Sequence, residues 1–203
     1  MEQEDRQFER MLFVARERLL QHGPEDISEK AEAAYENGAF LVPTFGQTVK
    51  ILLPSCAAIP QLSKWHALTL LHYLDLADGA PLTGNAIAFS QYKDGLVRGA
   101  GLDRNAELIV RRNLGLLPPE ELARRCRALG AELLDSNADF CARFSFAPHY
   151  PVWLKIWFAD EDFPASGHLF VDESAPHYLS IEDAVTVGSL ILDGLTGEQH
   201  WSR

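Results

Sequence analysis

FCARFSFAPHYPVWLKIWF, residues 140–158, is the stretch that decides the fold of this chain. Apolar residues occupy every second position in each half of it, and a period of two is typical of a strand with one buried face. The short connection Ala147–Pro151 separates the two halves. We therefore expect antiparallel neighbouring strands at 139–146 and 151–158, at the centre of a sheet.

The second of these strands carries large side chains on both faces. Trp153 and Trp157 alternate with Leu154 and Ile156, so the two pairs project to opposite sides of the sheet. Tryptophan is rarely left in water, because its ring is a large apolar surface. We therefore expect helices to cover both faces of this hairpin.

The rest of the chain supplies helices and further strands that are segregated along the sequence. Ser63 is expected to cap one helix, Asp103 another, and Ser180 with Asp183 forms a capping box for the last. The pattern predicts helices at 4–21, 27–36, 63–76, 103–114, 118–129 and 181–195, and further strands at 39–43, 47–53, 87–92 and 168–171. Segregated elements indicate an α+β fold, an antiparallel β-sheet with flanking helices. We expect one domain over 1–203, with 1–37 as its helical N-terminal segment.

Composition limits the partners of the protein. The chain has 203 residues, a formal net charge of -11 and no Lys or Arg between Lys155 and the terminal Arg203. Such a charge argues against nucleic acid and against an anionic membrane surface. Three widely separated cysteines form neither a disulfide framework nor a metal motif, which favours a reducing cytoplasm. A homodimer is compatible with this composition.

Two segments resemble a known family. The first is LTLLHYLDLADGAPLTGNAIAF, residues 68–89, and the second is ADEDFPASGHLFVDESAPHYLSIEDAVTVGSLI, residues 159–191. Together they resemble DUF3786, a bacterial and archaeal family without an assigned reaction. The matching residues are His72, Tyr73, Leu74, Gly79, Pro81, Leu82, Gly84, Phe89, Glu161, Asp162, Phe163, Pro164, Ala165, Leu169, Phe170, Asp172, Tyr178, Leu179, Glu182 and Asp183.

The resemblance implies a cytoplasmic protein associated with corrinoid and iron–sulfur proteins. Some relatives carry a cysteine-rich iron–sulfur module. This chain has no such module, so no cluster is expected here.

The acidic run Asp160, Glu161 and Asp162 directly follows a predicted strand. Dense carboxylates could hold Mg²⁺ or Ca²⁺, which prefer oxygen ligands. The alternative is a solvated turn in which backbone N–H groups hold one carboxylate. In either case we expect Phe163 to bury its ring and anchor the turn.

Histidines offer two further candidate sites. His168 and His177, with Asp172 and Glu173, could bind zinc or iron, although they lack a paired-histidine motif. His177 could equally form a hydrogen bond at the start of the last helix.

His66 and His72 lie on one predicted helix, about 120° apart around its axis. Either could bind the metal of a haem or corrinoid, and either could be a hydrogen-bonded core histidine. The arginines of the middle segment could bind propionate or acetamide arms of such a cofactor. They could equally match the acidic C-terminal quarter of the chain. The sequence contains neither a nucleophile elbow nor a phosphate-binding loop.

These observations leave two functions open. One is a small-molecule or cofactor-binding protein, for which a tetrapyrrole or corrinoid is a candidate ligand. The other is a metal-dependent enzyme that uses the acidic and histidine-containing block. We expect the pocket between 63–76 and 160–183. The residues expected to bind the ligand there are His72, Tyr73, His177 and Glu182.

Overall fold

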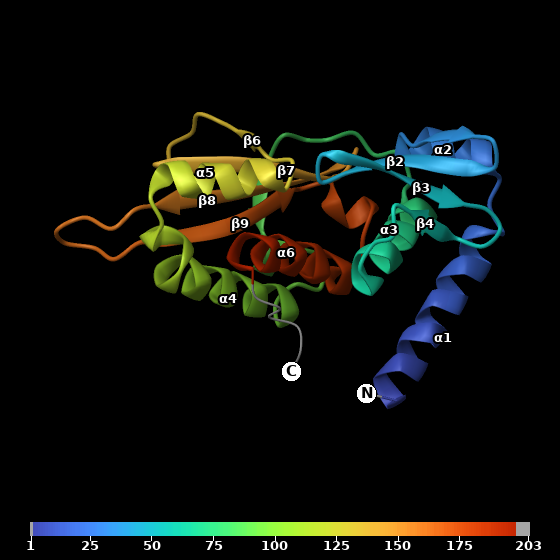
Figure 1. Cartoon of the computed structure of the whole chain (residues 1–203), viewed down its shortest axis with the longest axis horizontal. Helices are drawn as coiled ribbons and strands as arrows, with labels where there is room; N and C mark the ends of the chain where they lie inside the picture. Colours follow the sequence, from blue (N-terminus) through green and yellow to red (C-terminus); the bar gives the residue numbers. More distant parts are fainter. Residues whose placement is uncertain (1, 198–203) are drawn as a thin grey trace.

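The computed structural model describes residues 2–197, and side chains from Arg6 onward. It contains two antiparallel sheets, one of four strands in the order β1-β2-β3-β4 and one of five in the order β5-β9-β8-β7-β6. Figure 1 shows the two sheets side by side, with α4, α5 and α6 around the larger one and α1 extending away from the smaller one. The predicted α+β class with an antiparallel sheet is confirmed.

The helices are α1 (Glu2–Leu19), α2 (Pro24–Ala31), α3 (Lys64–Leu76), α4 (Arg98–Arg112), α5 (Pro119–Ala128) and α6 (Ile181–Thr196). The strands are β1 (Ala34–Glu36), β2 (Ala39–Thr44), β3 (Gln47–Leu52), β4 (Ala57–Ile59), β5 (Ala86–Ala88), β6 (Glu132–Leu133), β7 (Phe140–Ala147), β8 (Tyr150–Trp157) and β9 (Ser166–Asp172). Within residues 2–197, no helix has the length and apolar content needed to cross a membrane.

The predicted central hairpin is confirmed, because β7 and β8 pair as antiparallel neighbours. One face of it is fully buried, and α4 packs there with Val110 close to Gly167 of β9. The expectation of helices on both faces is wrong. The opposite face carries exposed Arg143 and only half-buried Trp153 and Trp157. Trp153 lies opposite Phe170 of β9 in the strand register, and the Lys155 ammonium lies over the Phe170 ring, so neighbouring side chains partly cover this face.

The predicted helix over 27–36 is too long. Helix α2 ends at Ala31, where Glu32 adopts a left-handed backbone with φ 47°. The chain then forms β1 and turns through Asn37 and Gly38 into β2. Gly38 therefore closes a hairpin rather than a helix, a role that the Asn-Gly pair favours.

The two sheets meet at the turn between β2 and β3. Phe45 donates its N–H to the carbonyl of Ser145 at 2.8 Å, which ties the turn to β7. Gly46 lies against Gly130 so closely that a Cβ on Gly46 would stand 2.6 Å from the Cα of Gly130. Neither residue can carry a side chain without separating the two segments.

Helix α4 begins at Arg98, five residues before the predicted cap Asp103. The Asp103 carboxylate instead accepts hydrogen bonds from the backbone N–H groups of Phe89 and Ser90. Gly99 approaches the Phe89 carbonyl so closely that an added Cβ would lie 1.9 Å from its oxygen. Asp103 thus holds the preceding segment against α4 rather than starting the helix.

The buried histidine of α3 supports the junction between the sheets. His66 is 8% exposed, and its Nε2 lies 2.8 Å from the Thr44 hydroxyl of β2. Phe45 and Phe146 flank its ring. Burial disfavours the charged imidazolium and lowers the pKa of His66 to about 4.

His66 should make stability depend on pH. Its pKa is lower in the folded chain than in the unfolded chain, so below pH 6.5 the unfolded state binds the extra proton. The stabilisation is complete above about pH 6.5 and is lost as the pH falls towards 4. Between pH 7 and pH 5, wild type should therefore lose roughly 2 kcal/mol of unfolding free energy that His66→Gln does not lose. Urea titrations of both proteins at the two pH values measure this difference, and equal pH slopes would contradict it.

Candidate functional site

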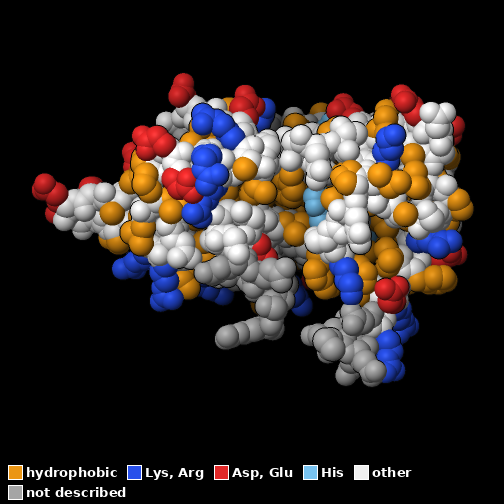
Figure 2. All heavy atoms as spheres, viewed as in Figure 1, with side chains coloured by type: hydrophobic (Ala, Val, Ile, Leu, Met, Phe, Trp, Pro, Cys, Tyr) orange, Lys and Arg blue, Asp and Glu red, His pale blue; other side chains and the backbone are white. Residues whose placement is uncertain are grey.

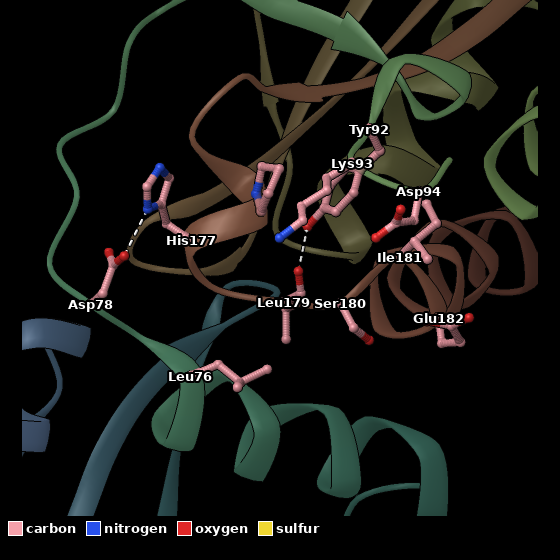
Figure 3. A pocket seen from close by; sticks show the side chains of 11 residues that line it. Leu76, Asp78, Tyr92, Lys93, Asp94, His177, Leu179, Ser180, Ile181 and Glu182 are labelled. Carbon is pink, nitrogen blue, oxygen red and sulfur yellow. Dashed lines mark hydrogen bonds and ion pairs between the residues drawn. The ribbon is translucent and has the colours of Figure 1, made fainter. Parts of the chain in front are cut away.

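A pocket of about 650 Å³ lies between the C-terminal end of α3 and the segment that leads into α6. Figure 3 shows Leu76 on one side and Tyr92 and Lys93 on the other, with His177 at one end and Glu182 at the opposite end. The lining residues are Leu76, Asp78, Tyr92, Lys93, Asp94, Pro176, His177, Leu179, Ser180, Ile181 and Glu182. The pocket therefore combines apolar walls with several charged groups.

The side chains of His177 and Asp78 form a hydrogen-bonded pair in the pocket. The imidazole Nδ1 lies 2.7 Å from the carboxylate of Asp78, and both side chains are about half exposed. Partial burial raises the pKa of Asp78, but hydrogen bonds from His177 and the backbone of Ala80 hold it below its usual range. An ionised carboxylate can only accept, so His177 donates its Nδ1–H to Asp78, and Nε2 is the ring nitrogen left to contact a ligand.

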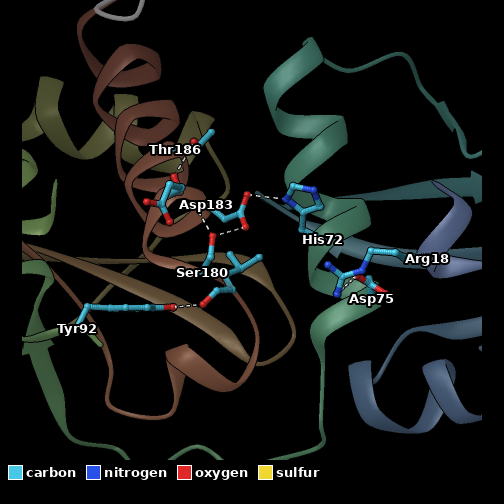
Figure 4. A network of polar contacts seen from close by, with 9 residues as sticks. Arg18, His72, Asp75, Tyr92, Ser180, Asp183 and Thr186 are labelled. Carbon is cyan, nitrogen blue, oxygen red and sulfur yellow. Dashed lines mark hydrogen bonds and ion pairs between the residues drawn. The ribbon is translucent and has the colours of Figure 1, made fainter. Parts of the chain in front are cut away.

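His72 does not line the pocket. Its Nδ1 lies 2.7 Å from Oδ1 of Asp183 in α6, while Oδ2 of Asp183 accepts the hydroxyl proton of Ser180. Figure 4 shows this network bridging α3 and α6. In a nucleophilic triad the imidazole lies between serine and carboxylate, whereas here the carboxylate lies between the other two. The network therefore joins two helices and leaves Ser180 without a base.

Tyr73 is fully buried behind the pocket. Its hydroxyl donates to the carbonyl of Ala31 and accepts from the N–H of His149. Its ring stacks on Tyr178, which in turn stacks on His149. Burial raises the pKa of Tyr73 well above its usual value. Of the four residues that the sequence nominated as ligand-binding, His177 and Glu182 line the pocket, and His72 and Tyr73 do not.

Four pocket residues were missed by sequence reasoning, namely Asp78, Tyr92, Lys93 and Asp94. Asp78 follows α3, and the other three follow β5 in a loop that carries no recognisable motif. Tyr92 donates its hydroxyl proton to the carbonyl of Leu179 at 2.8 Å, and burial raises its pKa. This hydrogen bond joins the two walls of the pocket. Nothing in the local sequence marked a binding loop here.

The acidic turn does not line this pocket and lies in the loop that joins β8 to β9, which projects at one end of the molecule, where Figure 2 shows acidic side chains. Oδ1 of Asp160 accepts the backbone N–H groups of Asp162 and Phe163, and these hydrogen bonds hold the pKa of Asp160 below its usual range. The expectation that Phe163 buries its ring is wrong, because this side chain is 70% exposed. The carboxylate, rather than the ring, fixes the turn.

A metal site receives no support from the described residues. Among residues 6–197, no group of three or more His, Cys, Asp or Glu side chains is arranged to hold a metal ion. The proposed metal ligands Asp160, Glu161 and Asp162 remain a prediction from the sequence. His168 projects from the half-buried face of the sheet, where its ring contacts Phe170.

Asp172, at the end of β9, is 1% exposed and holds three segments together. Its carboxylate accepts five hydrogen bonds, from the N–H and hydroxyl of Thr83, the N–H of Gly84, and the N–H and hydroxyl of Ser174. Burial raises its pKa, but these hydrogen bonds outweigh burial and lower it. Asp172 thereby fixes the start of the segment that forms one wall of the pocket.

Three arginines of the middle segment contact acidic side chains or carbonyls of the same chain. Arg124 and Arg125 both bind Glu121 in α5, and Arg125 also donates to the carbonyl of Leu195. Arg98 lies 3.7 Å from Glu182 at the edge of the pocket. Of these ion pairs, the one between Arg98 and Glu182 is of the kind that a match to the acidic C-terminal quarter predicts.

The chain belongs to the DUF3786 family. The family model, described as a domain of unknown function, matches residues 23–193, which include the pocket and both sheets. The resemblance inferred from the two segments is thereby confirmed. No curated protein and no solved structure was found to match the chain.

Replacing Asp172 tests its structural role. Asp172→Ala removes the acceptor of three N–H groups and two hydroxyls, and those of Ser174 are buried, so it should cost about 2 kcal/mol or more of unfolding free energy. The neighbour Glu173 is exposed and contacts only Asn85 among its recorded partners, so Glu173→Ala should stay within about 0.5 kcal/mol. Urea titration at pH 7 measures both. Equal losses would show that Asp172 is not the anchor.

Proposed function

We propose that the protein binds a small molecule in the pocket between α3 and α6. The observation that carries this proposal is the carboxylate-oriented imidazole of His177 beside an apolar wall formed by Leu76, Leu179 and Ile181. Ligand sites combine apolar walls with a few directed polar groups, and a volume of about 650 Å³ lies within the usual range for such sites.

The charge of the pocket suggests the kind of ligand. Three carboxylates, those of Asp78, Asp94 and Glu182, face one ammonium, that of Lys93. An excess of negative charge favours a ligand with a cationic centre and disfavours one with several acidic arms. A corrinoid, with its amide arms and cationic cobalt, meets this description better than a haem with its two propionates.

We propose that Nε2 of His177 contacts the cationic centre of the ligand. An imidazole whose other nitrogen is held by a carboxylate has a fixed ring orientation, as in metal-binding histidines. The Lys93 ammonium then donates hydrogen bonds to polar groups at the edge of the ligand. The alternative of a metal-dependent enzyme has no comparable support, because the metal would have to be bound by the exposed acidic turn.

We also infer a cytoplasmic location. The three cysteines, Cys56, Cys126 and Cys141, are free and buried. Burial raises the pKa of Cys126 to about 12, so its thiol stays protonated and unreactive. Free thiols of this kind suit a reducing compartment.

Binding should be tested on the full chain with three probes: aquocobinamide, haemin and spermidine. We expect aquocobinamide to bind with a shift of its visible spectrum, as its cobalt exchanges water for imidazole. His177→Ala should abolish the shift and weaken binding at least about tenfold, equivalent to about 1.4 kcal/mol. Isothermal titration calorimetry supplies the affinities.

The matched control is Glu161→Gln, which removes an exposed carboxylate outside the pocket. It should leave binding unchanged, whereas Glu182→Gln should weaken it. Equal affinities of wild type and His177→Ala for any probe that binds would place the ligand elsewhere. If spermidine alone binds, the pocket recognises small cations without a corrinoid ring.

A further inference from the structure

The family match begins at residue 23, so helix α1 lies outside it. One face of α1 packs on α3 through Phe8, Ala15 and Leu19, which are buried. The ring of Phe8 meets Trp65 edge to face, with centroids 5.4 Å apart. This added helix therefore has a defined inner face.

An ion pair fixes the C-terminal end of α1 on the rest of the molecule. Arg18 lies 3.0 Å from the carboxylate of Asp75, whose side chain is only 2% exposed. Figure 4 shows this pair between α1 and α3. Because the inner face and this pair hold the helix, its outer face points away from α3 in a fixed orientation.

The outer face is more apolar than a solvated surface requires. At 100° per residue, Phe13 and Val14 lie on the side of α1 away from the buried positions, and both are exposed, Phe13 by 62% and Val14 by 48%. Figure 1 shows α1 projecting away from the smaller sheet. Arg10 and Glu17, both exposed, lie on the same face and flank the apolar residues at either end.

We propose that α1 is a dimerisation helix that pairs antiparallel with α1 of a second copy of this chain. Around a two-fold axis between Phe13 and Val14, Arg10 of each copy stands opposite Glu17 of the other. The contact is therefore self-complementary, as a two-fold interface requires. No ion pair of Arg10 or Glu17 is recorded among the described residues, so both are available. This inference does not depend on the proposed ligand.

Net charge also favours this face over others for self-association. The whole chain carries -11, which opposes the approach of two copies. Helix α1 holds four Arg against five acidic residues and is nearly neutral. A contact through α1 therefore carries less charge repulsion than one through the strongly acidic C-terminal quarter.

Sedimentation velocity of the full chain between about 1 and 200 µM tests the proposal. Wild type should show a concentration-dependent monomer–dimer equilibrium. Phe13→Ser should weaken dimerisation by at least about tenfold, with an unchanged far-UV spectrum, because this side chain is exposed and not part of the core. The control Arg112→Glu, at the exposed end of α4, should leave dimerisation unchanged.

A charge exchange tests the antiparallel arrangement. Arg10→Glu and Glu17→Arg should each weaken dimerisation about tenfold, and the double variant should restore it to within about threefold of wild type. A wild type that stays monomeric at every concentration overturns the proposal. So does a dimer that Phe13→Ser leaves intact, or a double variant no better than its two parents.

Discussion

The buried carboxylate of Asp172 is the interaction on which the fold and the site both depend. A charge in a protein interior is costly unless hydrogen bonds replace its lost water, and five do so here. The donors come from the loop before β5 and from the turn after β9, which are distant in sequence. The same contacts therefore add β5 to the edge of the larger sheet and set the direction in which the chain leaves for α6.

The regular elements could be predicted from the sequence where burial is one-sided and caps are local. The β7–β8 hairpin follows from its alternation, and the start of α3 follows from Ser63, whose hydroxyl accepts the N–H of His66. The errors at Asp103 and Phe163 have a common physical origin. Each concerns a side chain whose role depends on a distant or competing contact. The Asp103 carboxylate binds a segment 13 or 14 residues away, and Asp160 holds its turn without help from a ring.

Only part of the candidate site could be predicted from the sequence. His177 and Glu182 stood out because they lie in a segment dense in polar and aromatic residues. His72 stood out for the same reason, but it binds Asp183, one residue along from the pocket residue Glu182. A helix turns by 100° per residue, so this single step moves the carboxylate from the pocket to the interface between α3 and α6. Lys93 and Tyr92 reach the pocket through tertiary folding, for which the local sequence holds no signal.

The contact between Gly46 and Gly130 has a consequence for how this chain can vary. Two backbones from different parts of the molecule touch where any side chain would intervene, since a Cβ on Gly130 would lie 2.4 Å from the Cα of Gly46. Both residues also have positive φ, of 76° and 72°. Substitution of one is therefore not relieved by a smaller residue at the other, since glycine is already the smallest. Neither glycine can therefore be replaced alone. Substitutions should be tolerated more readily in the sheets on either side than at the point where the two glycines meet.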